Sequence, residues 1–359
     1  MESTSSSSSP AVARLTALWA LAEVGLGGAL HAFRLPLTGL LVGSSAVVLL
    51  SLIAHAARRD GRPVGRTLLT ATAVVLGVKA AASPHAPVGA YLAVAFQGGL
   101  AALVLPVVGQ TVGPLVLGVV ALAESAVQRV LVMTLLFGAA FWDAVDALVA
   151  LAVRQIGPLV GIADGPASAS VWLVGVYVGV HVAMGAVAGV LGGRLPRRVF
   201  RASGEAEAMA LAAEAHQHVE ARASTRTQSG RAWWRRPIVR RLTLVALLLG
   251  AYALLGLADE TTRPLVAATI AFGRAIVLVS AWLMVVAPLV LRLLHRWAES
   301  SSQGIEVART ADQLPHLAAL ARIAWRRTQG RGAMRLITFA TLVTSAALAS
   351  PPPASPSAP

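Results

Sequence analysis

Long, nearly uncharged apolar windows are the feature that most constrains how this chain can fold. Several windows of about 18 to 25 residues carry almost no charged side chain, which is long enough for a helix to cross a bilayer. Hydrophobic residues make up 56% of the 359 positions and charged residues only 13%, whereas soluble domains average about 25% charged residues. The sequence therefore predicts an all-α polytopic membrane protein.

The apolar windows predict a six-helix transmembrane bundle over residues 12–200. We expect its helices at residues 12–33, 37–57, 64–82, 88–108, 115–136 and 170–191. The stretch "GQTVGP" (109–114) predicts a tight turn before the fifth helix, and "GGRLPRRVFR" closes the sixth. Residues 141–166 combine acidic and aromatic side chains, which favours an interfacial helix over a full span.

The pattern changes beyond residue 200. Residues 201–237 predict a cytoplasmic basic linker that contains a helix, and residues 238–349 predict a C-terminal appendix with two or three transmembrane helices. We expect the spans of the appendix at residues 238–257, 265–294 and 333–349. Residues 1–11 and 350–359 are rich in serine and proline and are expected to be disordered, and the first lacks the basic region of a cleaved signal peptide.

The arginines predict the orientation in the membrane. Four follow the second helix and four follow the sixth: Arg58, Arg59, Arg62 and Arg66, then Arg194, Arg197, Arg198 and Arg201. Short loops rich in arginine face the cytoplasm, so six crossings place the N-terminus inside. We expect a multi-pass protein of the bacterial cytoplasmic (inner) membrane, and the net charge of +14 then reflects topology rather than nucleic-acid binding.

Motifs of known enzyme and metal chemistry are missing from the sequence. It contains no cysteine, no G-x-x-x-x-G-K-[ST] phosphate loop and no H-E-x-x-H zinc motif. We therefore expect no enzymatic activity, no cofactor and no metal site.

A sparse set of polar side chains within the apolar spans supplies the candidate site. Such side chains are costly in hydrocarbon and usually face a bundle interior or a cavity. The candidates for ligand binding are Glu23, His31, Arg34, Lys79, Gln97, Glu124, Gln128 and Arg129. Glu124 and Gln128 lie four residues apart and share a helix face, so together with Arg129 they form the densest cluster in any span.

Each candidate also has a structural interpretation. Glu23 is alternatively a protonated or paired carboxyl group that fixes helix packing, and Arg34 and Lys79 are alternatively side chains that extend to the membrane interface. Gln97 is alternatively an amide that bridges helices, and Glu124 is alternatively neutralised by Arg129.

Other residues of the spans favour a packing role. His181 is isolated in the sixth helix, and we expect it to pack rather than bind. Gly185, Gly189 and Gly193 recur every fourth residue, which predicts close approach of another helix.

Three stretches of the predicted bundle carry a family resemblance. They are "LHAFRLPLTGLLVGS", "KAAASPHAPVGAYLAVAFQGGLAALVLPVVGQTVGP" and "HVAMGAVAGVLGGRLPRRV". Together with six helices and both ends inside, they resemble the substrate-binding S component of energy-coupling factor (ECF) transporters over residues 12–200. The residues beyond 200 depart from that family's pattern.

The resemblance implies a membrane-embedded subunit that binds a vitamin or other small molecule. It also implies partners: a separate transmembrane coupling subunit and ATPase subunits. Ala13, Ala17 and Ala20 would then dock on the coupling subunit, and the loop over residues 34–39 would cover the ligand. Two other functions stay open: an ion- or proton-coupled carrier that uses Glu23 and Glu124, and a structural or assembly protein of the membrane.

Overall fold

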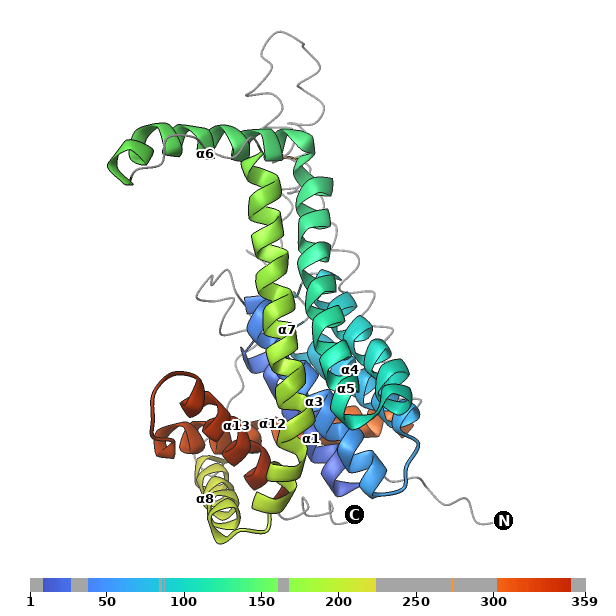
Figure 1. Ribbon diagram of the computed structural model, residues 1–359. Helices are drawn as coiled ribbons and strands as arrows, with labels where there is room; N and C mark the ends of the chain where they lie inside the picture. The colour runs from blue at the N-terminus through green and yellow to red at the C-terminus, as the bar shows by residue number, and fades with distance from the viewer. Residues whose placement is uncertain are drawn as a thin grey trace, which may run out of the picture. The chain divides into compact units, whose positions relative to one another are not determined.

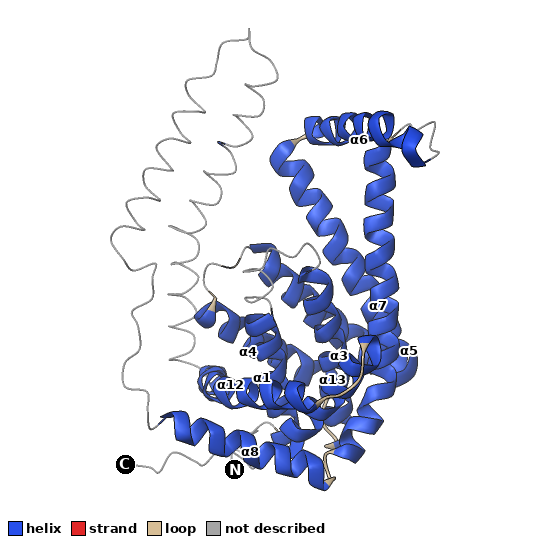
Figure 2. Ribbon diagram, turned by 90° about the vertical axis from the view of Figure 1, so that its left-hand side faces the viewer, coloured by secondary structure: helices blue, strands red, loops and turns tan. Residues whose placement is uncertain are grey.

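The computed structural model describes residues 9–26, 38–83, 86, 88–160, 168–223, 273 and 302–349. Every regular element in these residues is a helix, so the predicted all-α class is confirmed for the described part of the chain (Figure 2). The chain falls into two compact units. The first comprises Met1–Ser125, His181–Thr227 and Leu291–Pro359, and the second comprises Ala126–Val180 and Gln228–Val290.

Four helices in the described part of the chain are long and apolar enough to cross a membrane. They are α3 (Thr38–Arg59), α4 (Val64–Ala82), α5 (Val88–Phe137) and α7 (Ala169–Ala202). Several apolar helices of this length are what a multi-pass membrane protein requires. The spans predicted at residues 238–257 and 265–294 lie outside the described residues.

The first helix is the centre of the first unit. α1 (Pro10–Leu21) carries proline at its first turn, where the missing N–H leaves no bond unmade. It continues into a π-helical turn, η1 (Ala22–Leu26), so the predicted helix over residues 12–33 is described only as far as Leu26. α1 packs against α3, α4, α12 (Ser302–Arg327) and α13 (Gly332–Ala349). Its Leu15 and Trp19 side chains are completely buried.

α5 is two helices joined at a single residue. Gly109 has φ 87° and ψ −175°, which is the only non-helical conformation inside the element and is essentially restricted to glycine. Pro106 and Pro114 flank it, and each removes a helical hydrogen bond. The predicted end of the fourth helix at residue 108 is thus confirmed. The predicted six-residue turn is wrong, because the helix resumes directly after Gly109.

Close backbone contact joins α5 and α7 within the first unit. A Cβ atom added to Gly118 would overlap the carbonyl oxygen of Gly185, and one added to Gly189 would lie 2.5 Å from the Cα of Leu115. Only residues without a side chain allow helices to approach this closely. The close approach predicted from the glycine spacing is therefore confirmed.

The same packing explains why α7 extends beyond its predicted end. The sixth helix was expected to close at residue 191, and this is wrong because α7 runs to Ala202 through Pro196. Gly192 and Gly193 face other helices instead of ending their own. A Cβ on Gly192 would lie 2.7 Å from the hydroxyl oxygen of Ser51, and one on Gly193 would lie 3.3 Å from the carbonyl oxygen of Thr111.

Two helices from the C-terminal half of the chain, α12 and α13, pack against α1, and α12 also packs against α4 (Figure 1). α12 packs against α1, α4, α13 and α8 (Ala206–Ala223).

The imidazole rings of His216 in α8 and His316 in α12 lie 5.6 Å apart. Burial lowers the pKa of His316, and the charge of His216 lowers it further. The helices predicted within residues 201–237 and at 333–349 are confirmed as helices.

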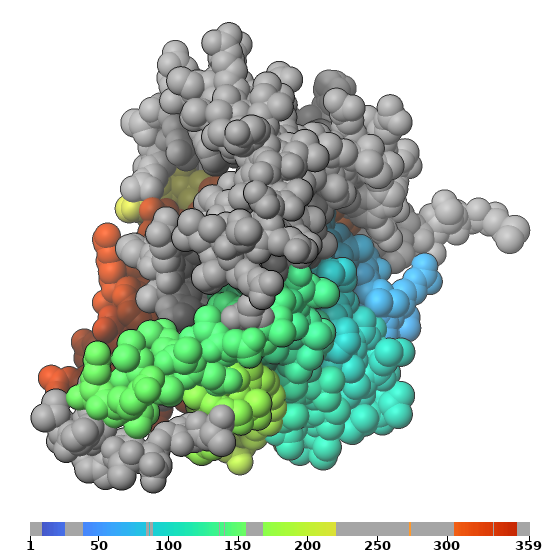
Figure 3. Space-filling model, turned by 90° about the horizontal axis from the view of Figure 1, so that it is seen from above, coloured from blue at the N-terminus to red at the C-terminus, as the bar shows by residue number. Residues whose placement is uncertain are grey.

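The described part of the second unit is built around α6 (Ala139–Val160), which lies across the end of α5 and the start of α7 (Figure 1). Asp146 of α6 accepts hydrogen bonds from the backbone N–H and the hydroxyl of Ser170, at 2.5 Å and 3.0 Å. This carboxylate thus satisfies donors at the N-terminus of α7. α6 lies on the surface (Figure 3) and is not among the helices that could cross a membrane. Its interfacial location stays a prediction.

We predict that Gly118→Ala destabilises the first unit by about 1 to 3 kcal/mol, because the added methyl group must push α5 and α7 apart. The measurement is the free energy of unfolding in detergent, from a denaturant titration followed by tryptophan fluorescence. Gly99→Ala is the matched control, since no atom lies within 4 Å of its added Cβ. The control should be neutral or more stable by up to about 1 kcal/mol. Equal stability of the two variants would contradict the close contact.

Candidate functional site

A buried ion pair lies at the centre of the candidate site. Glu23 is part of η1, and π-helical turns are rare elements that occur frequently at functional sites. The Nζ atom of Lys79, in the last turn of α4, donates a hydrogen bond to Glu23 Oε2 at 2.7 Å. The two side chains are only 3% and 8% exposed. Neither charge could be buried at this depth without the other.

The ammonium group of Lys79 has a second acceptor. It donates to the carbonyl oxygen of Ala90, in the first turn of α5, at 3.2 Å. Lys79 therefore connects η1, α4 and α5 through a single cation. The structural interpretation of Glu23 as a paired carboxylate is thus correct in this structure, and Lys79 does not extend to an interface.

Gln97 is a second buried polar group on α5. It is 3% exposed, and its Oε1 accepts no hydrogen bond from any described residue. Its Nε2 lies 3.4 Å from the position that a Cβ would take on Gly43 of α3. Gln97 follows Ala90 by seven residues and so lies on the same face of the helix, about 10 Å further along the axis. A buried acceptor without a donor is costly unless a ligand or water satisfies it.

The three residues of the cluster predicted on the fifth helix all lie on α5, after its break at Gly109. Glu124 belongs to the first unit and is half-buried, and its Oε2 is buried without a described hydrogen-bond partner. Gln128 and Arg129 belong to the second unit, where Gln128 is half-buried and Arg129 is exposed. Glu124 and Gln128 lie four residues apart on one continuous helix and therefore on the same face, and their use with Arg129 as one site stays a prediction.

The remaining predicted residues have different outcomes. His31 and Arg34, with the loop predicted to cover the ligand, lie outside the described residues. Ala17 and Ala20 are completely buried within this chain, and Ala13 is half-buried, so they pack internally here. His181 is 2% exposed, as expected for a side chain with a packing role.

Sequence reasoning missed the polar contacts between α3 and the kink of α5. His55 Nδ1 lies 3.1 Å from Gln110 Oε1, and Arg58 donates to the carbonyl oxygen of Leu105. The last carbonyl groups before a helix break have no helical donor, and a long arginine can supply one. These contacts join residues 55 and 47 positions apart, so no local pattern in the sequence predicts them.

We predict that Glu23→Gln lowers the free energy of unfolding by about 3 to 5 kcal/mol, because it leaves the Lys79 cation buried without a counter-charge. Denaturant titration of the detergent-purified chain measures this. The matched control is Glu214→Gln, since Glu214 pairs with Arg327 at a site where both side chains are more than 40% exposed. That change should cost about 1 kcal/mol or less. The double variant Glu23→Leu/Lys79→Met should recover most of the loss. Equal costs for Glu23→Gln and Glu214→Gln would show that the buried pair is not ionised.

No known protein family, curated protein or solved structure matches this chain. A function is therefore inferred from the buried polar groups themselves.

Proposed function

We propose that this protein is a membrane-embedded solute-binding subunit of a small-molecule uptake transporter. The observation that carries the proposal is the buried polar set Glu23, Lys79 and Gln97, supplied by η1, α4 and α5. Polar groups inside apolar helices are costly to bury and usually mark a binding or transport path.

The three side chains offer complementary chemistry to a small polar solute. A carboxylate accepts hydrogen bonds, an ammonium group donates them and an amide does both. Lys79 is held by Glu23, whereas Oε1 of Gln97 has no described donor. A solute with a carboxylate at one end and an N–H group about 10 Å away fits the spacing along α5. In the proposal, the carboxylate of the solute competes with Glu23 for Lys79, and its N–H group donates to Gln97.

The proposal includes the partners that the resemblance to ECF S components implies. A separate transmembrane coupling subunit and ATPase subunits would supply the energy for uptake of a vitamin or similar molecule. The protein would act in the bacterial cytoplasmic membrane with its N-terminus inside.

We predict that the purified protein binds a member of a vitamin panel without ATP. A ligand at about 100 times its Kd should stabilise the fold by about 2.7 kcal/mol, which raises the unfolding temperature by several degrees. Thermal-shift measurements on the detergent-purified chain detect this, and native mass spectrometry identifies the bound compound.

The matched pair of variants for this test is Gln97→Leu and Gln217→Leu. Gln217 is exposed on α8, so its substitution should leave affinity unchanged. Gln97→Leu should weaken binding at least about tenfold, because it removes a buried hydrogen-bond partner of the solute. A panel without any stabilising compound would argue against solute binding, and equal affinities of the two variants would exclude Gln97 from the site.

A proton-coupled carrier is the second candidate function. Glu124 favours it, since a half-buried carboxyl group with a buried, unpartnered Oε2 can exchange a proton without breaking an ion pair. In this mechanism the chain moves solute without ATPase subunits.

We predict for this second function that panel compounds drive proton movement across proteoliposomes that contain the wild-type chain. An entrapped pH-sensitive dye reports the movement. Glu124→Gln should abolish it, whereas Glu207→Gln, at an exposed position of α8, should not. Proton movement that persists in Glu124→Gln, or none in the wild type, would rule out this carrier mechanism.

A further inference from the structure

A cleft of about 240 Å³ lies between α1, the turn from α3 to α4, α4 itself and α12. Arg66 in its lining is separated from Lys79 of the buried ion pair by 13 positions of α4, or about 20 Å, whereas Val74 in its lining is five positions from Lys79. All of its walls belong to the first unit. None of the candidate ligand-binding residues from the sequence lines it.

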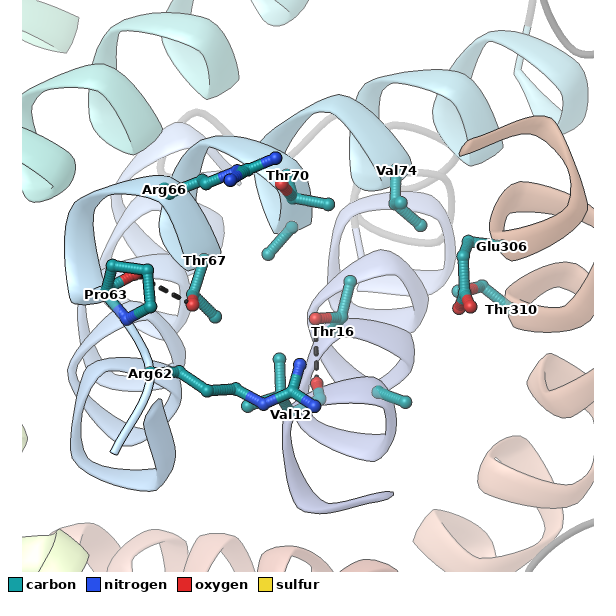
Figure 4. A pocket seen from close by; sticks show the side chains of 12 residues that line it. Val12, Thr16, Arg62, Pro63, Arg66, Thr67, Thr70, Val74, Glu306 and Thr310 are labelled. Carbon is teal, nitrogen blue, oxygen red and sulfur yellow. Dashed lines mark hydrogen bonds between the residues drawn. The ribbon is translucent and has the colours of Figure 1, made fainter. Parts of the chain in front are cut away.

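The cleft is rich in positive charge. Arg62 extends across it toward Val12 and Thr16, and Arg66 lies beside Thr70 (Figure 4). Arg66 has no hydrogen-bond or ion-pair partner among the described residues. The one acidic side chain in the lining is Glu306, which accepts a hydrogen bond from Arg309 at 2.9 Å. The lining therefore favours an anion.

A hydroxyl group without a hydrogen-bond partner among the described residues also lines the cleft. Thr310 of α12 is 4% exposed and lines the cleft, yet its hydroxyl has no hydrogen-bond partner among the described residues. Thr16 and Thr67 differ, because each donates to the carbonyl oxygen four residues earlier in the chain, at 2.8 Å and 3.0 Å. The Thr310 hydroxyl is therefore available to donate to or accept from a ligand or water in the cleft.

The N-terminus of α4 opens onto the same cleft. Pro63 is the N-cap, it provides no side-chain hydrogen bond, and it lines the cleft together with Arg66 and Thr67. The first N–H groups of a helix have no helical acceptor and carry a partial positive charge. Guanidinium groups, a hydroxyl and a free helix N-terminus are the combination that proteins use to bind phosphate.

We propose that this cleft binds a phosphate group, with Arg66, Thr310 and the first turn of α4 as its ligands. The predicted topology places the turn from α3 to α4 at the cytoplasmic face, where phosphate groups come either from anionic lipids or from soluble compounds. Because both α4 and α12 line the cleft, a bound phosphate also holds α12 against α4.

The test uses the full-length chain in detergent, with two probes. Native mass spectrometry measures retention of phosphatidylglycerol against phosphatidylcholine, and isothermal titration at low ionic strength measures binding of inorganic pyrophosphate. Arg66→Gln should weaken binding about tenfold or more, the loss expected for one charge-assisted hydrogen bond. Thr310→Val should weaken it as well, and this nearly isosteric change keeps the wall intact. Arg194→Gln is the matched control, since Arg194 is exposed on α7, outside the cleft, and has no described partner.

The two probes distinguish the sources of the phosphate group. Preferential retention of phosphatidylglycerol that Arg66→Gln abolishes supports a lipid headgroup. Binding of pyrophosphate that Arg66→Gln abolishes supports a soluble phosphate compound. The proposal fails if neither probe binds, or if Arg66→Gln and Arg194→Gln weaken binding equally.

Discussion

The buried ion pair between Glu23 and Lys79 constrains the rest of the first unit. Two opposite charges that are 3% and 8% exposed remain ionised only if the helices that carry them keep one fixed register. The second bond of Lys79, to Ala90, adds the start of α5 to that register. Glu23 lies in the π-helical turn at Ala22–Leu26 that follows α1. The irregular backbone therefore coincides with the residue that pairs with Lys79 of α4.

α4 connects two polar regions of different character. Its 19 residues span about 28 Å as a helix, close to the thickness of the hydrocarbon core of a bilayer. Lys79 in its last turn is neutralised by a carboxylate, whereas Arg66 in its first turn has no described partner. The end with the ion pair suits a solute whose carboxylate can replace Glu23 at Lys79, and the cationic end suits a phosphate group at the predicted cytoplasmic face.

Sequence patterns predict the helices of this chain better than their contacts. The predicted bounds of α4 agree with the structure, because Pro63 and Ser83 interrupt an otherwise continuous apolar helix. Glu23 and Lys79 could each be identified as unusual, but their pairing joins residues 56 positions apart, which no local period reveals. Gly192 and Gly193 have the pattern of a helix end, and tertiary packing overrides it. Arg62 and Arg66 indicated orientation alone, because the cleft also requires α12, whose position the sequence does not give.

The C-terminal helices change what the resemblance to an S component implies for the assembly. α12 and α13 pack against α1 together with α3 and α4, and the Nη1 of Arg14 donates to the carbonyl oxygen of Leu348 in α13 at 2.5 Å. Ala17 and Ala20, which the resemblance would place against a coupling subunit, are completely buried as a result. If the resemblance holds, a coupling subunit would contact another surface of this chain or displace α12 and α13 from α1. Displacement of α12 would also separate α4 and α12, which both line the cleft. Docking of such a partner would therefore weaken phosphate binding, and bound phosphate would oppose docking.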